Sequence, residues 1–222
     1  MRTLSLLALF ALPVFALAYT VVETIVTEPY EIIPVENDVA VATTYLGTLA
    51  DYPVMYEFVV EEKAEFSAQL AQPKGVPAEE LGLLLIRRND QGAGVKEIAR
   101  QKTVREEWVQ TRDSLLGLTL EQAEPLDVQL EPGTYRLEVS SPRNMTQYML
   151  TIGQEPDEVG YGAELSYVRQ TQAYFGYSVI TMLRSSLVYY PIGIIILLAA
   201  FYQTARFARR RRDTQPQPDT HA

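Results

Sequence analysis

The chain of 222 residues has no cysteine and a single histidine, His221, which is the next-to-last residue. Without cysteine there is no disulfide framework, no thiolate metal site and no thiol nucleophile, so an extracytoplasmic domain must depend on its apolar core alone. One histidine in a polar tail also removes most histidine-based zinc and acid-base chemistry. We therefore expect a protein without a metal or another cofactor.

Motifs of catalysis and nucleotide binding are missing as well. The sequence contains no GxSxG, HExxH, Walker A or GxGxxG pattern. Adjacent acidic residues such as Glu106 and Glu107 point to opposite faces of a strand, which is typical of a solvated edge and not of paired glycosidase carboxylates. A lone Asp90 followed by glycines also falls short of the six or more oxygens that calcium needs. These absences predict a protein that is not an enzyme.

Positive charge is scarce until the C-terminus is reached. Residues 19–186 contain 26 acidic and 13 basic residues, whereas residues 203–222 contain five arginines and two aspartates. An acidic domain repels the phosphates of nucleic acid. We therefore expect no nucleic-acid partner.

One long uncharged run, Leu187–Tyr202 (LVYYPIGIIILLAAFY), lies near the C-terminus. With Ser185 and Ser186 in front of it, the run offers about 18 residues, roughly 27 Å of helix at 1.5 Å per residue. This length predicts a transmembrane helix over residues 185–205. Basic residues directly behind the run predict a membrane anchor that is attracted to anionic lipid. They are Arg206, Arg209, Arg210, Arg211 and Arg212.

The position of the arginines also predicts sidedness. By the positive-inside bias, the C-terminus is cytoplasmic and the acidic domain lies outside. We therefore expect a single-pass protein of the inner or plasma membrane, with the lipid bilayer as one partner. Residues 206–222 are expected to form a basic, disordered cytoplasmic tail.

A shorter apolar run occupies the N-terminus. Residues 1–18 carry one arginine and then an apolar stretch, with the small residues Ala16 and Ala18 just before Tyr19. This pattern predicts a secretory signal peptide that is cut before Tyr19. The alternative is an uncleaved anchor that adds a second span; Pro13 and the short apolar length favour cleavage.

Between the two runs the apolar residues repeat every second position. Residues 19–38 mix β-branched residues with glutamate and proline, which predicts an extended linker that continues into an edge strand. Residues 39–153 alternate in short segments that are separated by glycine and proline turns, so they predict an antiparallel β-sandwich. Within them, the continuous apolar run 81–88 predicts a strand that is buried on both faces.

After Gly153 the apolar spacing becomes helical. Residues 154–184 are expected to form a linker and then an amphipathic juxtamembrane helix from Ala163 to Arg184. Its apolar stripe has to be covered by the sandwich, by lipid headgroups or by another protein, and we expect a partner contact there. The stripe consists of Leu165, Val168, Phe175, Val179 and Met182.

Residues Glu131–Ile152, EPGTYRLEVSSPRNMTQYMLTI, carry a resemblance to a known family. A PGTY turn leads one strand and a Y-x-L-x-I strand follows, so the segment resembles the closing hairpin of bacterial pre-peptidase C-terminal domains. Leu46–Leu49 and Tyr56–Val60 are similar to the opening strands of that family. The resemblance covers residues 39–153, and it implies a jelly-roll-like, non-catalytic module that sometimes binds calcium or polymeric substrates. This chain differs in having no peptidase attached, no evident acidic calcium cluster, and a membrane span close behind the module.

Together these features predict a mainly β, non-catalytic membrane protein whose sandwich and juxtamembrane helix contact another membrane or envelope protein. The alternative is a membrane-tethered module that binds carbohydrate or cell wall. In that case Trp108, the only tryptophan, is the platform on which a sugar stacks. The competing interpretation of Trp108 is packing in the core or at its rim.

Overall fold

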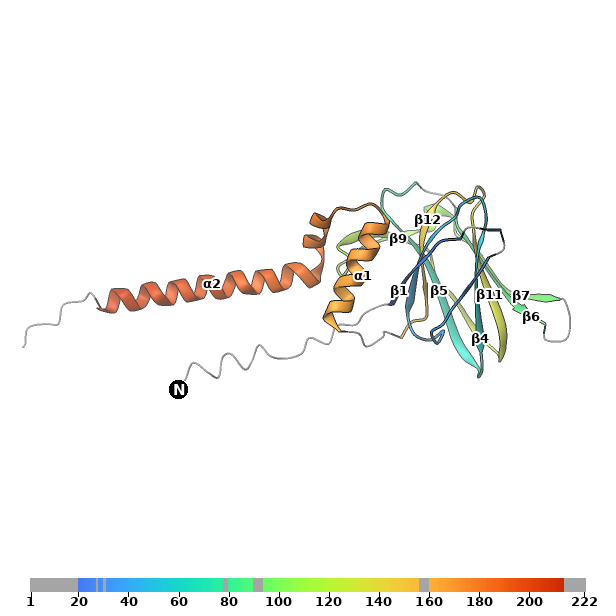
Figure 1. Cartoon of the computed structure of the whole chain (residues 1–222), viewed down its shortest axis with the longest axis horizontal. Coiled ribbons are helices and arrows are strands. Elements are labelled where there is room, and N and C mark those ends of the chain that lie inside the picture. The colour runs from blue at the N-terminus through green and yellow to red at the C-terminus, as the bar shows by residue number, and fades with distance from the viewer. Residues whose placement is uncertain are drawn as a thin grey trace, which may run out of the picture.

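The computed structural model of the protein describes residues 20–213 except 27, 30, 78–79, 90–93 and 156–159. The expected signal peptide and residues 214–222 of the expected tail lie outside the described residues. A β domain and a long helix follow one another along the long axis of the molecule, and a short helix lies where they meet (Figure 1).

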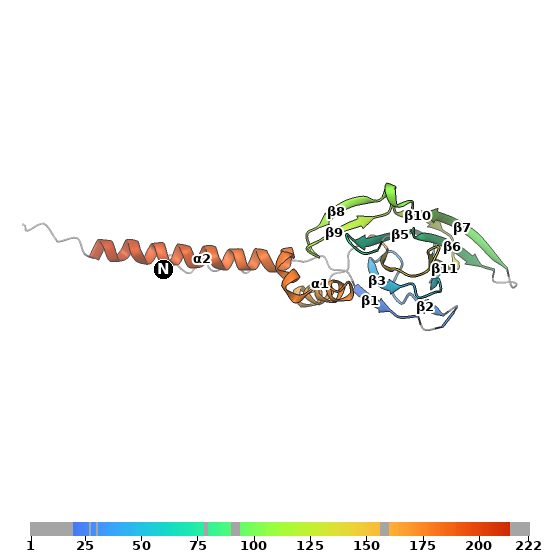
Figure 2. The same cartoon turned by 90° about the horizontal axis from the view of Figure 1, so that it is seen from above.

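The β domain is a sandwich of two sheets, as the sequence predicts (Figure 2). The first sheet has the order β1-β3-β12-β5-β9-β8, with β10 paired to β5, and the second has the order β2-β4-β11-β6-β7. The strands of the first sheet are β1 (Thr20–Thr24), β3 (Thr43–Thr48), β5 (Ala64–Pro73), β8 (Val109–Asp113), β9 (Leu118–Gln122), β10 (Leu126–Leu130) and β12 (Gln147–Ile152). Those of the second are β2 (Ile32–Pro34), β4 (Val54–Val60), β6 (Gly82–Arg88), β7 (Val95–Lys102) and β11 (Gly133–Ser140).

The prediction of a purely antiparallel sandwich is wrong at two edges, because β1 pairs with β3 and β2 pairs with β4 in parallel. The segment that was predicted to begin as a linker therefore begins with a strand, β1, over Thr20–Thr24. Thr24, the last residue of β1, attaches this strand to the sandwich. Its hydroxyl donates to the Leu46 carbonyl at 3.0 Å and lies 3.2 Å from the Tyr56 hydroxyl.

The main core fills the space between the sheets and includes several buried tyrosines. The hydroxyls of Tyr56 and Tyr148 lie 2.9 Å apart, and burial raises the pKa of both phenols, which keeps them neutral. In β6, Leu83 and Leu85 are buried but Leu84 is only half-buried. Burial of this strand on both faces was therefore a wrong prediction, because the second sheet is fully covered on one face only.

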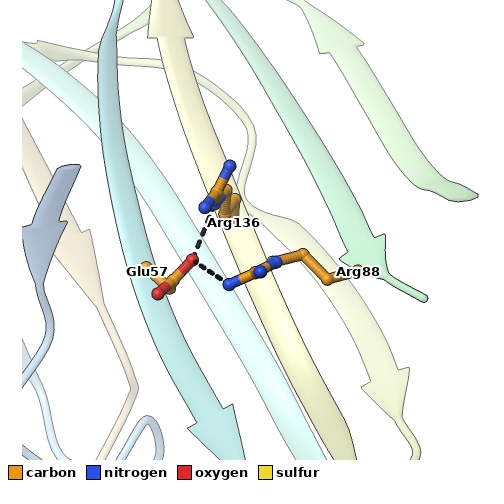
Figure 3. A network of polar contacts seen from close by, with 3 residues as sticks. All are labelled: Glu57, Arg88 and Arg136. Carbon is orange, nitrogen blue, oxygen red and sulfur yellow. Dashed lines mark hydrogen bonds and ion pairs between the residues drawn. The ribbon is translucent and has the colours of Figure 1, made fainter. Parts of the chain in front are cut away.

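The outer face of the second sheet carries a small polar network (Figure 3). One carboxylate oxygen of Glu57 accepts from Arg136 Nε at 2.7 Å and from Arg88 Nη1 at 3.3 Å. Glu57 and Arg136 are register partners on β4 and β11, so the pair joins neighbouring strands across the sheet. Partly exposed pairs of this kind contribute at most about 1 kcal/mol each.

Four helical segments complete the described chain. They are η2 (Arg105–Glu107), α1 (Tyr161–Tyr174), the 3₁₀-helix η3 (Val179–Arg184) and α2 (Ser186–Asp213). In α2, residues Ser186–Phe207 are long and apolar enough to cross a membrane, and none of this apolar segment is buried. The backbone of α2 stays helical to Asp213, so the expectation of disorder from residue 206 is wrong as far as residue 213.

The single juxtamembrane helix predicted over 163–184 is interrupted at Gly176. This residue has φ of +75°, a conformation that glycine adopts without steric cost. The N–H of Tyr177 donates to the Gln172 carbonyl at 2.8 Å and that of Gly176 to the Ala173 carbonyl at 2.9 Å. These two bonds form a Schellman motif, which ends α1 and turns the chain toward η3.

Candidate functional site: the junction of sandwich and helix

A second core lies on the outer face of the first sheet, beneath α1. Leu116, Leu118 and Met149 from the sandwich pack there with Tyr167 and Val168 of α1. Half-buried Leu187, in the first turn of α2, packs against the same cluster. The sheet, α1 and the beginning of α2 therefore share one core where the sandwich meets the long helix.

The face that α1 buries differs from the predicted stripe. The buried residues follow helical spacing, but three of the five are polar: Glu164, Tyr167, Val168, Thr171 and Gln172. Gln172 fits this position because its Nε2 donates to the Leu116 carbonyl at 2.7 Å. Glu164 is 1% exposed, and burial raises the pKa of its carboxyl group.

The five residues of the predicted stripe therefore have separate environments. Val168 is fully buried in the second core, so the prediction of a partner contact is wrong for this residue. Leu165, Phe175 and Met182 are half-buried, and Val179 is exposed. The stripe is divided because the chain turns at Gly176.

A turn between β8 and β9 holds the start of α2 directly. The Ser186 N–H donates to the Ser114 carbonyl at 2.8 Å, and the Ser185 hydroxyl donates to the Leu115 carbonyl at 2.5 Å. The turn is itself shaped by Asp113, whose Oδ1 accepts from the Leu116 N–H at 2.8 Å. We call these contacts between residues 113–118 and residues 184–187 the junction.

Gly117 allows the two segments of the junction to approach each other closely. A Cβ atom at this position would lie 2.6 Å from the carbonyl carbon of Arg184 and 2.7 Å from the nitrogen of Ser185. Its φ of +68° is also a conformation that L-residues rarely adopt. Backbone therefore packs directly on backbone between the sandwich and α2.

Tyr161 adds a link from α1 to α2. Its hydroxyl donates to the Leu187 carbonyl at 2.6 Å. In a regular helix this carbonyl accepts from the N–H four residues later, but that residue is Pro191, which has no N–H. The phenol of α1 thus supplies the hydrogen bond that the proline leaves open.

The other predicted site residues lie apart from the junction. Trp108 is half-buried and packs against the main core, in agreement with the rim-packing interpretation. Arg206 is exposed on α2, and the backbone of residues 209–212 continues the same helix. The sequence analysis did not identify Tyr161 or Gly117 as residues of the junction. Pro191 has no N–H, so the sequence does show that the Leu187 carbonyl needs another donor, which is Tyr161. Nothing in the sequence points to the role of Gly117.

Acidic side chains line two hollows of the sandwich, one of about 940 Å³ that includes Glu36, Glu61 and Glu62, and another of about 770 Å³. Glu65, Asp127 and Glu155 line the smaller hollow, and Asp127 accepts a hydrogen bond from Gln154 at 3.2 Å. Within the described part of the chain, no three histidine, aspartate or glutamate side chains are grouped so as to hold a metal ion. The junction is therefore the most specific arrangement that the described residues offer.

The architecture is a two-sheet β-sandwich joined to one apolar helix, and the solved structures similar to this chain each cover part of it. The pre-peptidase C-terminal domain of a collagenase from Bacillus anthracis is 16% identical over 57% of this chain and 97% of its own, with a TM-score of 0.35. The mitogen derived from Yersinia pseudotuberculosis is 17% identical over 53% of this chain and 89% of its own, with a TM-score of 0.36. PliG from Aeromonas hydrophila, a periplasmic inhibitor of g-type lysozyme, is 12% identical over 61% and 98%, with a TM-score of 0.33.

No protein-family model matches the sequence, and no curated protein matches it. A pre-peptidase C-terminal domain is thus among the solved structures that this chain resembles, as the pattern of residues 131–152 predicts. Similarity at this level concerns the fold and carries no information on function.

Proposed function

We propose that the chain is a single-pass membrane protein that holds a non-catalytic sandwich at a fixed orientation outside the membrane, as an interaction or accessory module for another membrane or envelope protein. The observation that carries this proposal is the junction. Three hydrogen bonds, from the turn 113–118 and from Tyr161, hold residues 185–187 at the very start of the apolar helix. The start of α2 is thus hydrogen-bonded directly to the sandwich and to α1.

A sandwich that is held at a fixed orientation relative to α2 favours binding to a partner that is itself embedded in the membrane. A module on a flexible linker searches a wide volume but pays the ordering entropy when it binds, whereas a preorganised module pays less of it. The five arginines at and after Arg206 support an orientation in which the acidic sandwich is outside. The carbohydrate-binding alternative has less support, because Trp108 is half-buried and packs against the main core.

A single experiment tests both the sidedness and the partner. Since the chain contains no cysteine, Val109→Cys on β8 and Phe207→Cys on α2 each give one thiol, at positions that are both 64% exposed. Intact cells are treated with a membrane-impermeant maleimide that carries a photo-crosslinker. We expect labelling at residue 109 and, after illumination, one reproducible adduct with a membrane or envelope protein.

Phe207→Cys serves as the matched control, since it should react only after the membrane is opened. Labelling of residue 207 but not of residue 109 in intact cells would contradict the proposed sidedness. Labelling of residue 109 without any protein adduct, repeated at the exposed Val59→Cys, would contradict the interaction role.

A further inference from the structure

The 3₁₀-helix η3 presents large apolar side chains to the surroundings although it is only six residues long. Val179 is 62% exposed, Ile180 is 74% exposed and Leu183 is 56% exposed. Because a 3₁₀-helix has three residues per turn, Ile180 and Leu183 lie on the same side. An apolar patch of this kind, directly beside an apolar helix, needs a cover.

The length of the apolar helix determines where η3 lies relative to a bilayer. The 21 residues between Arg184 and Arg206 span about 31 Å at 1.5 Å per residue, and a hydrocarbon core is about 30 Å thick. A span therefore has no spare length, and Arg184 has to stand at the outer edge of the hydrocarbon. Ile180 and Leu183 precede it by four residues and one residue, so they lie at the same boundary.

The junction keeps η3 at that level. The Ser185 N–H donates to the Met182 carbonyl at 2.9 Å, while the Ser185 hydroxyl is bound to Leu115 of the sandwich. Arg112 lies on β8 two residues before Ser114, whose carbonyl accepts the hydrogen bond of the Ser186 N–H at the start of α2. Two cations from separate elements, Arg112 and Arg184, therefore lie near the outer boundary, where lipid phosphates are found.

We propose that η3 is an interfacial lipid contact, in which Val179, Ile180 and Leu183 insert between the headgroups and acyl chains of the outer leaflet. Lipid is favoured over a protein as the cover because the patch directly precedes the apolar helix α2, whose apolar segment contains no buried residue. The inference rests on the proposed function, since it requires α2 to span the membrane. A second contact beside the span would resist tilting of the sandwich against the bilayer.

The test uses the full chain in phosphatidylcholine vesicles that contain a phospholipid with a nitroxide quencher at a shallow acyl position. Single-cysteine variants Ile180→Cys, Ile195→Cys and Val95→Cys carry the same small fluorophore. Ile195 is the reference for the span, and Val95 is an exposed valine on β7, which lies at the end of the sandwich away from α2 (Figures 1 and 2). We expect at least a twofold loss of fluorescence at residue 180 and no loss at residue 95.

The reference positions separate the possible failures. If residue 195 is not quenched even by a deep-acyl nitroxide, α2 does not span and the proposed function fails together with the inference. If residue 195 is quenched by the deep nitroxide but residue 180 is as bright as residue 95, the inference alone is overturned. Quenching at residue 180 that appears only when the protein is diluted in lipid would show that a second copy covers η3, which also overturns it.

Discussion

Among single residues, Glu164 has the least favourable surroundings. It is almost fully buried on the face of α1 that packs against the sandwich, and neither carboxylate oxygen has a hydrogen-bond partner among the described residues. Burial raises the pKa of this group, so the folded state holds its proton more tightly than the unfolded chain does. The raised pKa therefore costs no stability below the unfolded pKa; its cost grows as the pH rises from there and becomes constant above the folded pKa.

Replacing Glu164 by glutamine is expected to stabilise the protein by about 1 kcal/mol at pH 7, because the buried charge is removed. The gain should disappear toward about pH 4, where the wild-type carboxyl group is protonated as well. Thermal unfolding followed by the fluorescence of Trp108 measures both values. The exposed Glu62→Gln is the matched control and should change stability by less than about 0.5 kcal/mol; an equal gain from Glu164→Gln at both pH values would contradict the electrostatic explanation.

For single residues, the sequence predicts burial within a strand well, but it predicts the contacts of individual side chains poorly. The alternation within residues 39–153 correctly predicts strands, in which Tyr56, Leu137 and Tyr148 lie on the buried face, because the period of a strand follows from local geometry. The burial of Gln172 was not predictable, since it depends on a carbonyl at Leu116 that is 56 residues away in the chain. For the same reason, the apolar stripe of residues 165–182 was a poor guide to the face that α1 buries.

Where elements meet, the turn 113–118 and the first residues of α2 pack closely enough to make a sharp prediction. Gly117→Ala places a Cβ atom against the backbone of residues 184–185 and also forces an L-residue into a positive φ. Gly75→Ala is the matched control, because φ there is +102° but no atom lies within 4 Å of the added Cβ. We expect a loss of about 1 kcal/mol at residue 75 from backbone strain alone, and a loss larger by at least about 1 kcal/mol at residue 117.

Limited proteolysis and thermal unfolding of both variants check this expectation. The Gly117 variant should also be cut faster between residues 174 and 186, since the junction no longer shields that segment. Equal effects of the two alanines on stability and cleavage would contradict a close approach of the turn to α2.

Element boundaries show a similar division between local and distant causes. The turn at Pro132 and Gly133 and the strands on either side were predictable, because their signals lie next to each other in the sequence. The expected hairpin was wrong, because β11 lies in the second sheet while β10 and β12 lie in the first. The end of α1 at Gly176 was also signalled locally by the glycine, although the apolar spacing led to one continuous helix. The parallel pairing of β1 with β3 was not predictable, since it is fixed by contacts of Thr24 with Leu46 and Tyr56.

For the whole molecule, the sequence correctly predicts a mainly β sandwich followed by one apolar helix, because both follow from period and length. It does not predict that the start of α2 is hydrogen-bonded directly to the sandwich. That property comes from Ser114, Gly117, Tyr161 and Ser185, which are unremarkable by composition and meet only in the folded chain. These contacts hold the sandwich in a fixed position relative to α2. The proposed function and the proposed lipid contact of η3 both depend on this.

The most direct test of this fixed position is a disulfide across the junction in native membranes. The Ser186 nitrogen lies 2.8 Å from the Ser114 carbonyl oxygen, a backbone contact across which we expect a disulfide to form, and the natural chain has no cysteine. After mild oxidation, the Ser114→Cys, Ser186→Cys variant should form an intramolecular bond that protects both thiols from alkylation, whereas a Val95→Cys, Ser186→Cys pair should stay reactive. Equal alkylation of the two pairs would show that the sandwich does not rest on α2, and the account would be wrong.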